Sequence, residues 1–236
     1  MGETSVFNQQ TLAVTAAAAL AATTSLHAAT LLGPTPYLSF ADSPFNGSGL
    51  QIFLEDFEDQ LFNAPGVTAV SNAGGTLAVD GGTINTDSVD GDDGVIDGFG
   101  RDGFALSEAS NNIGTDNLGY TFTFDAAALG GLPTHAGIVW TDGSQSASTQ
   151  VEFFGPGDVS LGVIGPIKIS DNSFAGGTAE DHFFGAINAA GIESFTIRSP
   201  GGFNNLTVDH LQYNIVPEPA ALAVLTLAGL PLIRRR

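Results

Sequence analysis

Acidic residues are the side chains of this sequence whose spacing best suits a chemical task. Carboxylates are interleaved with glycines in one short stretch, and its acids include Asp87, Asp90, Asp92, Asp93 and Asp97. Ca²⁺ takes about six to eight oxygen ligands and tolerates flexible loops, so this stretch predicts a Ca²⁺ site. The spacing differs from that of an EF-hand, and a solvated acidic loop between strands is the alternative interpretation.

Motifs for catalysis are missing from the sequence. There is no G-x-S-x-G elbow, H-E-x-x-H, P-loop or dinucleotide fingerprint, and the absence of cysteine excludes thiolate metal sites, a cysteine nucleophile and disulfides. His182 and His210 each follow an aspartate, but neighbours on a strand point to opposite faces. We therefore predict no catalytic residue. Acids are plentiful enough that a glycosidase-like carboxylate pair stays open as an alternative.

Charge narrows the classes of partner. The chain of 236 residues has a formal net charge of −19, which excludes most nucleic-acid binders because they need a basic patch. Without Glu3, Glu218 and the three C-terminal arginines, 23 acids and three bases remain, a net charge of −20. Residues 29–215, which carry this charge and are called the body below, repel acidic polymers unless a cation bridges them.

Residues 51–215 have the pattern of an antiparallel β-sandwich. Short segments of period two, such as residues 120–124, are separated by Gly, Asn and Asp, and the continuous apolar run at 136–140 fits a central strand. Many short strands with glycine-rich turns are typical of sandwiches. Residues 29–50 are rich in Pro, Ser and Gly, and indicate a linker or a lead-in strand.

Local patterns within residues 51–215 predict several connections. Residues 151–163 predict a hairpin with its turn at 155–158, and residues 182–197 predict a second hairpin with its turn at 188–191. One helical turn is expected near residues 125–130. In the last strand the alternation slips at Asp209 and His210, which indicates a β-bulge. Trp140, Tyr120 and Tyr213 are candidates for sugar stacking, but the strands of the first two look central, where aromatic rings usually form core.

The two ends of the predicted sandwich, residues 51–215, resemble jelly-roll carbohydrate-binding and galactose-binding-like modules. The resemblance is carried by LEDFED at residues 54–59 and TVDHL at residues 207–211. It implies that the first and last strands lie side by side and that their carboxylates hold a structural Ca²⁺. The matching positions are Glu58 and Asp209, with Asp56 as a third. Solvent-facing acids on edge strands are the other interpretation.

Residues 1–28 indicate a signal peptide. Residues 12–22 form an apolar run of signal-peptide length, too short for an ordinary membrane span, and small residues follow it. The preceding segment MGETSVFNQQ has no Lys or Arg, which departs from the usual pattern. A buried Ala-rich helix is the alternative interpretation.

Residues 216–236 contain Pro217-Glu218-Pro219, an apolar stretch at 220–233 and then Arg234, Arg235 and Arg236. As a helix, the 14 apolar residues would span about 21 Å, which is short of a bilayer core of about 30 Å. The arginines favour the cytoplasmic side. This order resembles the PEP-CTERM sorting signal, which implies recognition by an exosortase in a Gram-negative-type bacterium that makes extracellular polysaccharide.

Together these patterns predict an all-β, jelly-roll-like sandwich flanked by an N-terminal signal helix and a C-terminal hydrophobic helix. The expected protein passes through the export machinery, inserts transiently in the inner membrane and reaches the cell surface or extracellular matrix. We expect a non-enzymatic role with extracellular polysaccharide, Ca²⁺ as the only cofactor and no nucleic acid. A secreted polysaccharide hydrolase or lyase, and a structural surface protein without a defined ligand, are the two alternatives.

Overall fold

The structure, a computed structural model, describes residues 28–81, 87–89, 103–108, 119–143, 148–170, 180–200 and 206–215. The predicted terminal helices, within residues 1–27 and 216–236, lie outside these ranges. So do Asp90, Asp92, Asp93 and Asp97 of the acidic loop. No helix in the described ranges is long and apolar enough to cross a membrane.

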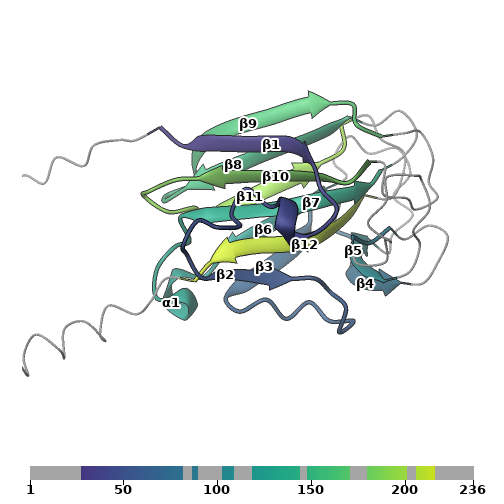
Figure 1. The fold of residues 1–236 in the computed structure, drawn as a ribbon, viewed down its shortest axis with the longest axis horizontal. Helices are drawn as coiled ribbons and strands as arrows, with labels where there is room; N and C mark the ends of the chain where they lie inside the picture. The colour runs from purple at the N-terminus through teal and green to yellow at the C-terminus, as the bar shows by residue number, and fades with distance from the viewer. Residues whose placement is uncertain are drawn as a thin grey trace, which may run out of the picture.

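Two antiparallel sheets face each other and form a β-sandwich (Figure 1). The first sheet has the order β1 (Thr30–Pro36), β10 (His182–Ile187), β7 (His135–Asp142), β12 (Thr207–Asn214), β5 (Phe104–Glu108) and β4 (Leu77–Gly81), and β2 (Ile52–Glu55) also pairs with β12. The second has the order β3 (Val67–Ser71), β6 (Gly119–Phe124), β11 (Ser194–Arg198), β8 (Thr149–Gly155) and β9 (Val159–Ile167). The predicted all-β antiparallel sandwich is thus confirmed.

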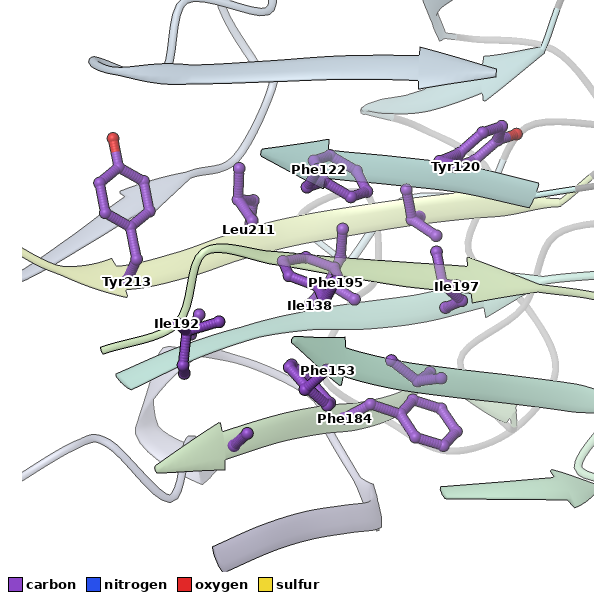
Figure 2. Packing of buried hydrophobic residues seen from close by; sticks show 14 of the residues in the cluster. Tyr120, Phe122, Ile138, Phe153, Phe184, Ile192, Phe195, Ile197, Leu211 and Tyr213 are labelled. Carbon is purple, nitrogen blue, oxygen red and sulfur yellow. The ribbon is translucent and has the colours of Figure 1, made fainter. Parts of the chain in front are cut away.

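Aromatic side chains from both sheets fill the space between them (Figure 2). Phe195 of β11 lies at the centre of this core, with its ring 4.9 Å from Phe122 and 5.3 Å from Phe153. The period-two pattern of β6 follows from this packing, because Phe122 is buried while Thr123 is exposed. Trp140 is fully buried in β7, as expected for a central strand.

A second, smaller hydrophobic cluster lies on the outer face of the first sheet. Tyr37 and Phe45, which follow β1, pack with Val139, Phe183 and Val89. The segment between β1 and β2, which includes the short 3-10 helix η1 (Phe40–Asp42), passes in front of β7 and β12 in Figure 1. Because this segment covers the sheet, β7 is apolar on both faces, which explains its continuous apolar run.

Two predicted local features are confirmed. The segment 151–163 forms the hairpin of β8 and β9, and the expected helical turn is α1 (Ala126–Leu129), whose N-cap Asp125 accepts bonds from Ala127 N and Ala128 N.

The second predicted hairpin is wrong. Strand β10 pairs with β1 and β7 in the first sheet, whereas β11 pairs with β6 and β8 in the second. The turn between them is closed locally by Gly191 N donating to the carbonyl of Asn188 over 3.0 Å. Asn188 N and Ile192 N donate to the carbonyls of Thr134 and Pro133. The chain therefore crosses from one sheet to the other at this turn.

Candidate functional site at the joint of the first and last strands

The last strand, β12, contains the predicted bulge. Its register with β7 shifts between Asp209 and Gln212, and His210 has a positive φ of 45°. On the other side of β12, Leu211 is paired with Glu55 of β2. The first and last strands of residues 51–215 therefore lie side by side, as the resemblance to jelly-roll modules implies.

Asp209 is a fully buried carboxylate at this bulge, with 0% of its surface exposed. Its Oδ2 accepts bonds from Val89 N at 2.9 Å and Ser88 Oγ at 3.0 Å. Its Oδ1 accepts from the backbone N–H of His210 at 2.6 Å. These donors compensate a buried charge that would otherwise be costly, and they fix residues 88 and 89 against the outer face of the first sheet.

Glu58 reaches the same serine from the loop that follows β2. Its Oε1 lies 3.4 Å from Ser88 Oγ and accepts a 2.7 Å bond from Phe104 N. A hydroxyl has one proton, and Asp209 is the nearer acceptor. Ser88 therefore stands between the two carboxylates that the sequence predicted as Ca²⁺ ligands.

Residues 87–89, the described part of the acidic loop, contact the other predicted Ca²⁺ site. Asp87, the first acid of the loop, is fully buried, and its carbonyl accepts a 3.0 Å bond from Thr141 Oγ1 of β7. Ser88, the next residue, contacts Glu58 and Asp209. The predicted third ligand, Asp56, accepts a bond from Glu58 N at 3.3 Å, so it shapes the loop that carries Glu58.

The described residues offer fewer oxygen ligands at this place than Ca²⁺ takes. Glu58, Asp209 and the Ser88 hydroxyl converge, whereas Ca²⁺ needs about six to eight oxygens. Among the residues that the structure describes, no group of three or more His, Asp or Glu side chains is placed to hold a metal. Asp90, Asp92, Asp93 and Asp97, the predicted ligands that follow directly, lie outside the described ranges.

A chain of buried polar side chains continues from the bulge along the outer face of the first sheet. Ser43 Oγ donates to Gln212 Oε1 (2.5 Å), and Gln212 Nε2 donates to the Tyr37 hydroxyl (2.9 Å). The Tyr37 hydroxyl also shares a hydrogen bond with His210 Nδ1, 2.9 Å away. Sequence reasoning missed this network, because residues 37–43 had no pattern that linked them to the last strand.

Burial also shifts the titration of groups near β2. Desolvation raises the pKa of Glu55, although the backbone N–H groups of Asn63 and Phe57 lower it in part. Desolvation and the nearby Glu55 raise the pKa of Tyr213, whose hydroxyl donates to the carbonyl of Pro65 over 2.7 Å. Desolvation lowers the pKa of the half-buried His135.

The aromatic candidates for sugar stacking belong to the core. Trp140, Tyr120 and Tyr213 are each fully buried. Large exposed apolar side chains do occur in the described ranges, but they are the aliphatic Leu50, Leu61, Val70, Val159 and Val163. Sugar stacking on those three rings is therefore excluded in this structure.

No protein-family model and no curated protein sequence matches this chain. Solved structures of two adhesin domains are among those similar to it. The K2 cleaved adhesin domain of Lys-gingipain has a TM-score of 0.40 and 12% identity, over 72% of this chain and 100% of that chain. The K3 cleaved adhesin domain of Lys-gingipain from Porphyromonas gingivalis has a TM-score of 0.37 and 18% identity, over 69% and 98%. With TM-scores below 0.5, neither similarity bears on function.

Proposed function

We propose that this chain is an exported, exosortase-sorted surface or matrix protein of a Gram-negative-type bacterium. Its jelly-roll-like body, in this proposal, associates with extracellular polysaccharide and is not an enzyme. The observation that carries the sorting role is the order of Pro217-Glu218-Pro219, the apolar residues 220–233 and the arginine cluster 234–236.

The physical properties of residues 216–236 fit transient insertion in the inner membrane. Two prolines prevent a helix from continuing back into the body. An apolar segment of about 21 Å is a marginal anchor in a hydrocarbon core of about 30 Å, so its fate depends on an enzyme that reads the motif. The arginines keep that end on the cytoplasmic side. Residues 1–28, read as a signal peptide, supply the route out of the cytoplasm.

The polysaccharide role rests on the charge of the body and on the resemblance to carbohydrate-binding modules. A net charge of −20 on residues 29–215 opposes contact with an acidic polymer unless a divalent cation bridges the two. Trp140, Tyr120 and Tyr213 are buried, which favours ionic contact over stacking for the association that we propose.

We further propose that Ca²⁺ binds where Glu58, Asp209 and the acidic loop beginning at Asp87 meet. Two carboxylates converge on Ser88, and hard oxygen donors suit this ion. Ligands from the acidic loop would complete the shell, so the two clusters would act as one site. The ion would then cross-link the first and last strands to that loop.

Binding to polysaccharide is expected to depend on Ca²⁺. The full chain should retain uronate-containing polysaccharides on a glycan array in CaCl₂ and lose them in EDTA. NaCl at matched ionic strength should not replace Ca²⁺, because screening alone forms no bridge. Equal binding in EDTA, or release of new reducing ends from the polysaccharide, would contradict a bridged and non-enzymatic association.

Ca²⁺ is also expected to stabilise the body against heat. A ligand that binds only the native state adds about 2.7 kcal/mol at a hundredfold excess over Kd, which raises Tm by roughly 5–11 °C for a domain of this size. The Tm in CaCl₂ should therefore be higher than the Tm in NaCl of equal ionic strength, and this difference should saturate as CaCl₂ is raised.

Two glutamate variants distinguish a specific site from general screening. The difference in Tm between CaCl₂ and NaCl should fall in Glu58→Gln and persist in Glu193→Gln. The second variant removes the same charge from a turn near the second sheet, where Glu193 accepts from Gly157 N. Equal rises in Tm with both salts, in all three proteins, would show that neither acidic cluster holds a specific Ca²⁺ site.

A further inference from the structure

An apolar groove opens along one side of the sandwich, between β3 and β4. Its volume is about 560 Å³. It is lined by Gln60, Leu61, Phe62, Ala69, Val70, Ser71, Gly74, Gly75, Leu77, Val79 and Leu106. Among these described residues, only Gln60 and Ser71 have hydrogen-bonding side chains, so this part of the groove suits apolar side chains better than a sugar.

The rim of this groove leaves two large aliphatic side chains in solvent. Leu61 is 58% exposed and Val70 is 56% exposed. Leu77 and Val79 are half-buried in β4, and the core residue Leu106 lies at the groove as well. An apolar surface that continues from the core to the outside is typical of an interaction site.

Both walls of the groove are edge strands. Strand β3 is the outermost strand of the second sheet and β4 is an outermost strand of the first, and Figure 1 shows both on the lower side of the sandwich. Next to β3, the carbonyl of Gly66 accepts from Asp125 N, and Asn72 N donates to the carbonyl of Gly119.

In an antiparallel pair, alternate residues bond to the partner strand. The even-numbered residues from Gly66 to Asn72 therefore direct their backbone N–H and C=O groups towards β6. Ala69 directs its backbone N–H and C=O away from β6, on the open side of the strand. An exposed edge of this kind pairs with an extended peptide through main-chain hydrogen bonds.

The charge next to the groove is negative. Asp59, which precedes the lining residue Gln60, is exposed. Asp80 lies on the face of β4 opposite to the lining residues Leu77 and Val79, where it accepts from Ser107 Oγ over 2.6 Å. The described residues that line the groove include no lysine or arginine. A strand that fits here combines alternating apolar side chains with basic flanks, because the body itself carries a net charge of −20.

From this groove, edge and charge, we propose that β3 binds an extended peptide segment of a partner protein. The segment would pair with the β3 edge at Ala69, place apolar side chains between Val70 and Leu77, and set a Lys or Arg residue against Asp59. Glu58, Ser88 and Asp209 of the proposed Ca²⁺ site are not among the described residues that line this groove.

Fluorescence anisotropy of a labelled peptide tests this proposal with the full chain. The probe is a short peptide of alternating valine and threonine with lysines at both ends. We expect saturable binding that weakens as NaCl is raised. The same peptide with N-methyl groups on the edge that faces β3 should bind at least about tenfold more weakly, since it keeps its side chains and loses several hydrogen bonds.

Two valine variants supply the matched control. Val70→Arg should weaken binding at least about tenfold, whereas Val159→Arg should not change it. Val159 is 61% exposed on β9, the opposite edge of the same sheet. The proposal is overturned by no saturable binding, by equal binding of the N-methylated peptide, or by equal effects of the two variants. If the chain sediments as a dimer and Val70→Arg makes it monomeric, the groove binds a second copy of the chain instead.

Discussion

Replacement of Phe195 by alanine is expected to lower the free energy of unfolding by about 3–5 kcal/mol. Phe195 is fully buried, and its ring contacts Phe122, Phe124 and Phe153 at centroid distances of 4.9, 6.2 and 5.3 Å. It joins β11 to the neighbouring strands β6 and β8. Truncation removes these contacts and leaves a cavity that the surrounding rings fill only in part. The chain has no cysteine, so its stability depends on this core without help from disulfides.

Equilibrium unfolding in urea, followed by far-ultraviolet circular dichroism, measures this loss. Val159→Ala is the control, because an aliphatic side chain that is 61% exposed contributes within about 0.5 kcal/mol. A loss below about 1 kcal/mol for Phe195→Ala would fall outside the range for a buried ring, and would contradict its central place in the core.

Asp209→Ala is expected to lower the free energy of unfolding by about 2–6 kcal/mol. The substitution removes the acceptor for Val89 N, His210 N and Ser88 Oγ. The two backbone N–H groups are left without this acceptor in a buried site, at about 1–3 kcal/mol each. Asp209→Asn should have an intermediate effect, since its amide oxygen can accept on one side while its NH₂ group faces donors on the other.

Asp158→Asn is the matched control for Asp209→Asn. It removes the same charge from an exposed turn where φ is 62°, a conformation that asparagine tolerates. Its expected change is within about 0.5 kcal/mol. Equal losses in the two asparagine variants would attribute the effect to net charge and contradict a specific role for the Asp209 carboxylate.

The sequence predicted those parts of the fold that depend on local pattern. The alternation of residues 120–124 and the turn at 155–158 identify strands and a hairpin through short-range chemistry alone. The slip at Asp209 and His210 predicted the bulge because a bulge changes the period of a single strand. Residues 182–197 failed as a hairpin because two strand-like segments joined by a short turn do not specify which sheet each strand joins.

The candidate site was predictable to a similar extent. Glu58 and Asp209 were identified through resemblance at the two ends of the body, and the pairing of β2 with β12 brings those ends together. The place of Ser88 between them was not predictable, since it depends on a loop folding over the outer face of the first sheet. The bond from Tyr37 to His210 spans 173 positions, and no local pattern indicates a contact at that separation.

The most direct test of the proposed function is the location of the protein in an exosortase-bearing bacterium. Epitope-tagged chain should reach the cell surface or matrix, and replacement of Pro217-Glu218-Pro219 by alanines should leave it in the inner membrane or release it misprocessed. Deletion of the exosortase should give the same result with the unchanged chain. An identical distribution of the natural and alanine-substituted chains between inner membrane, surface and medium would contradict the account.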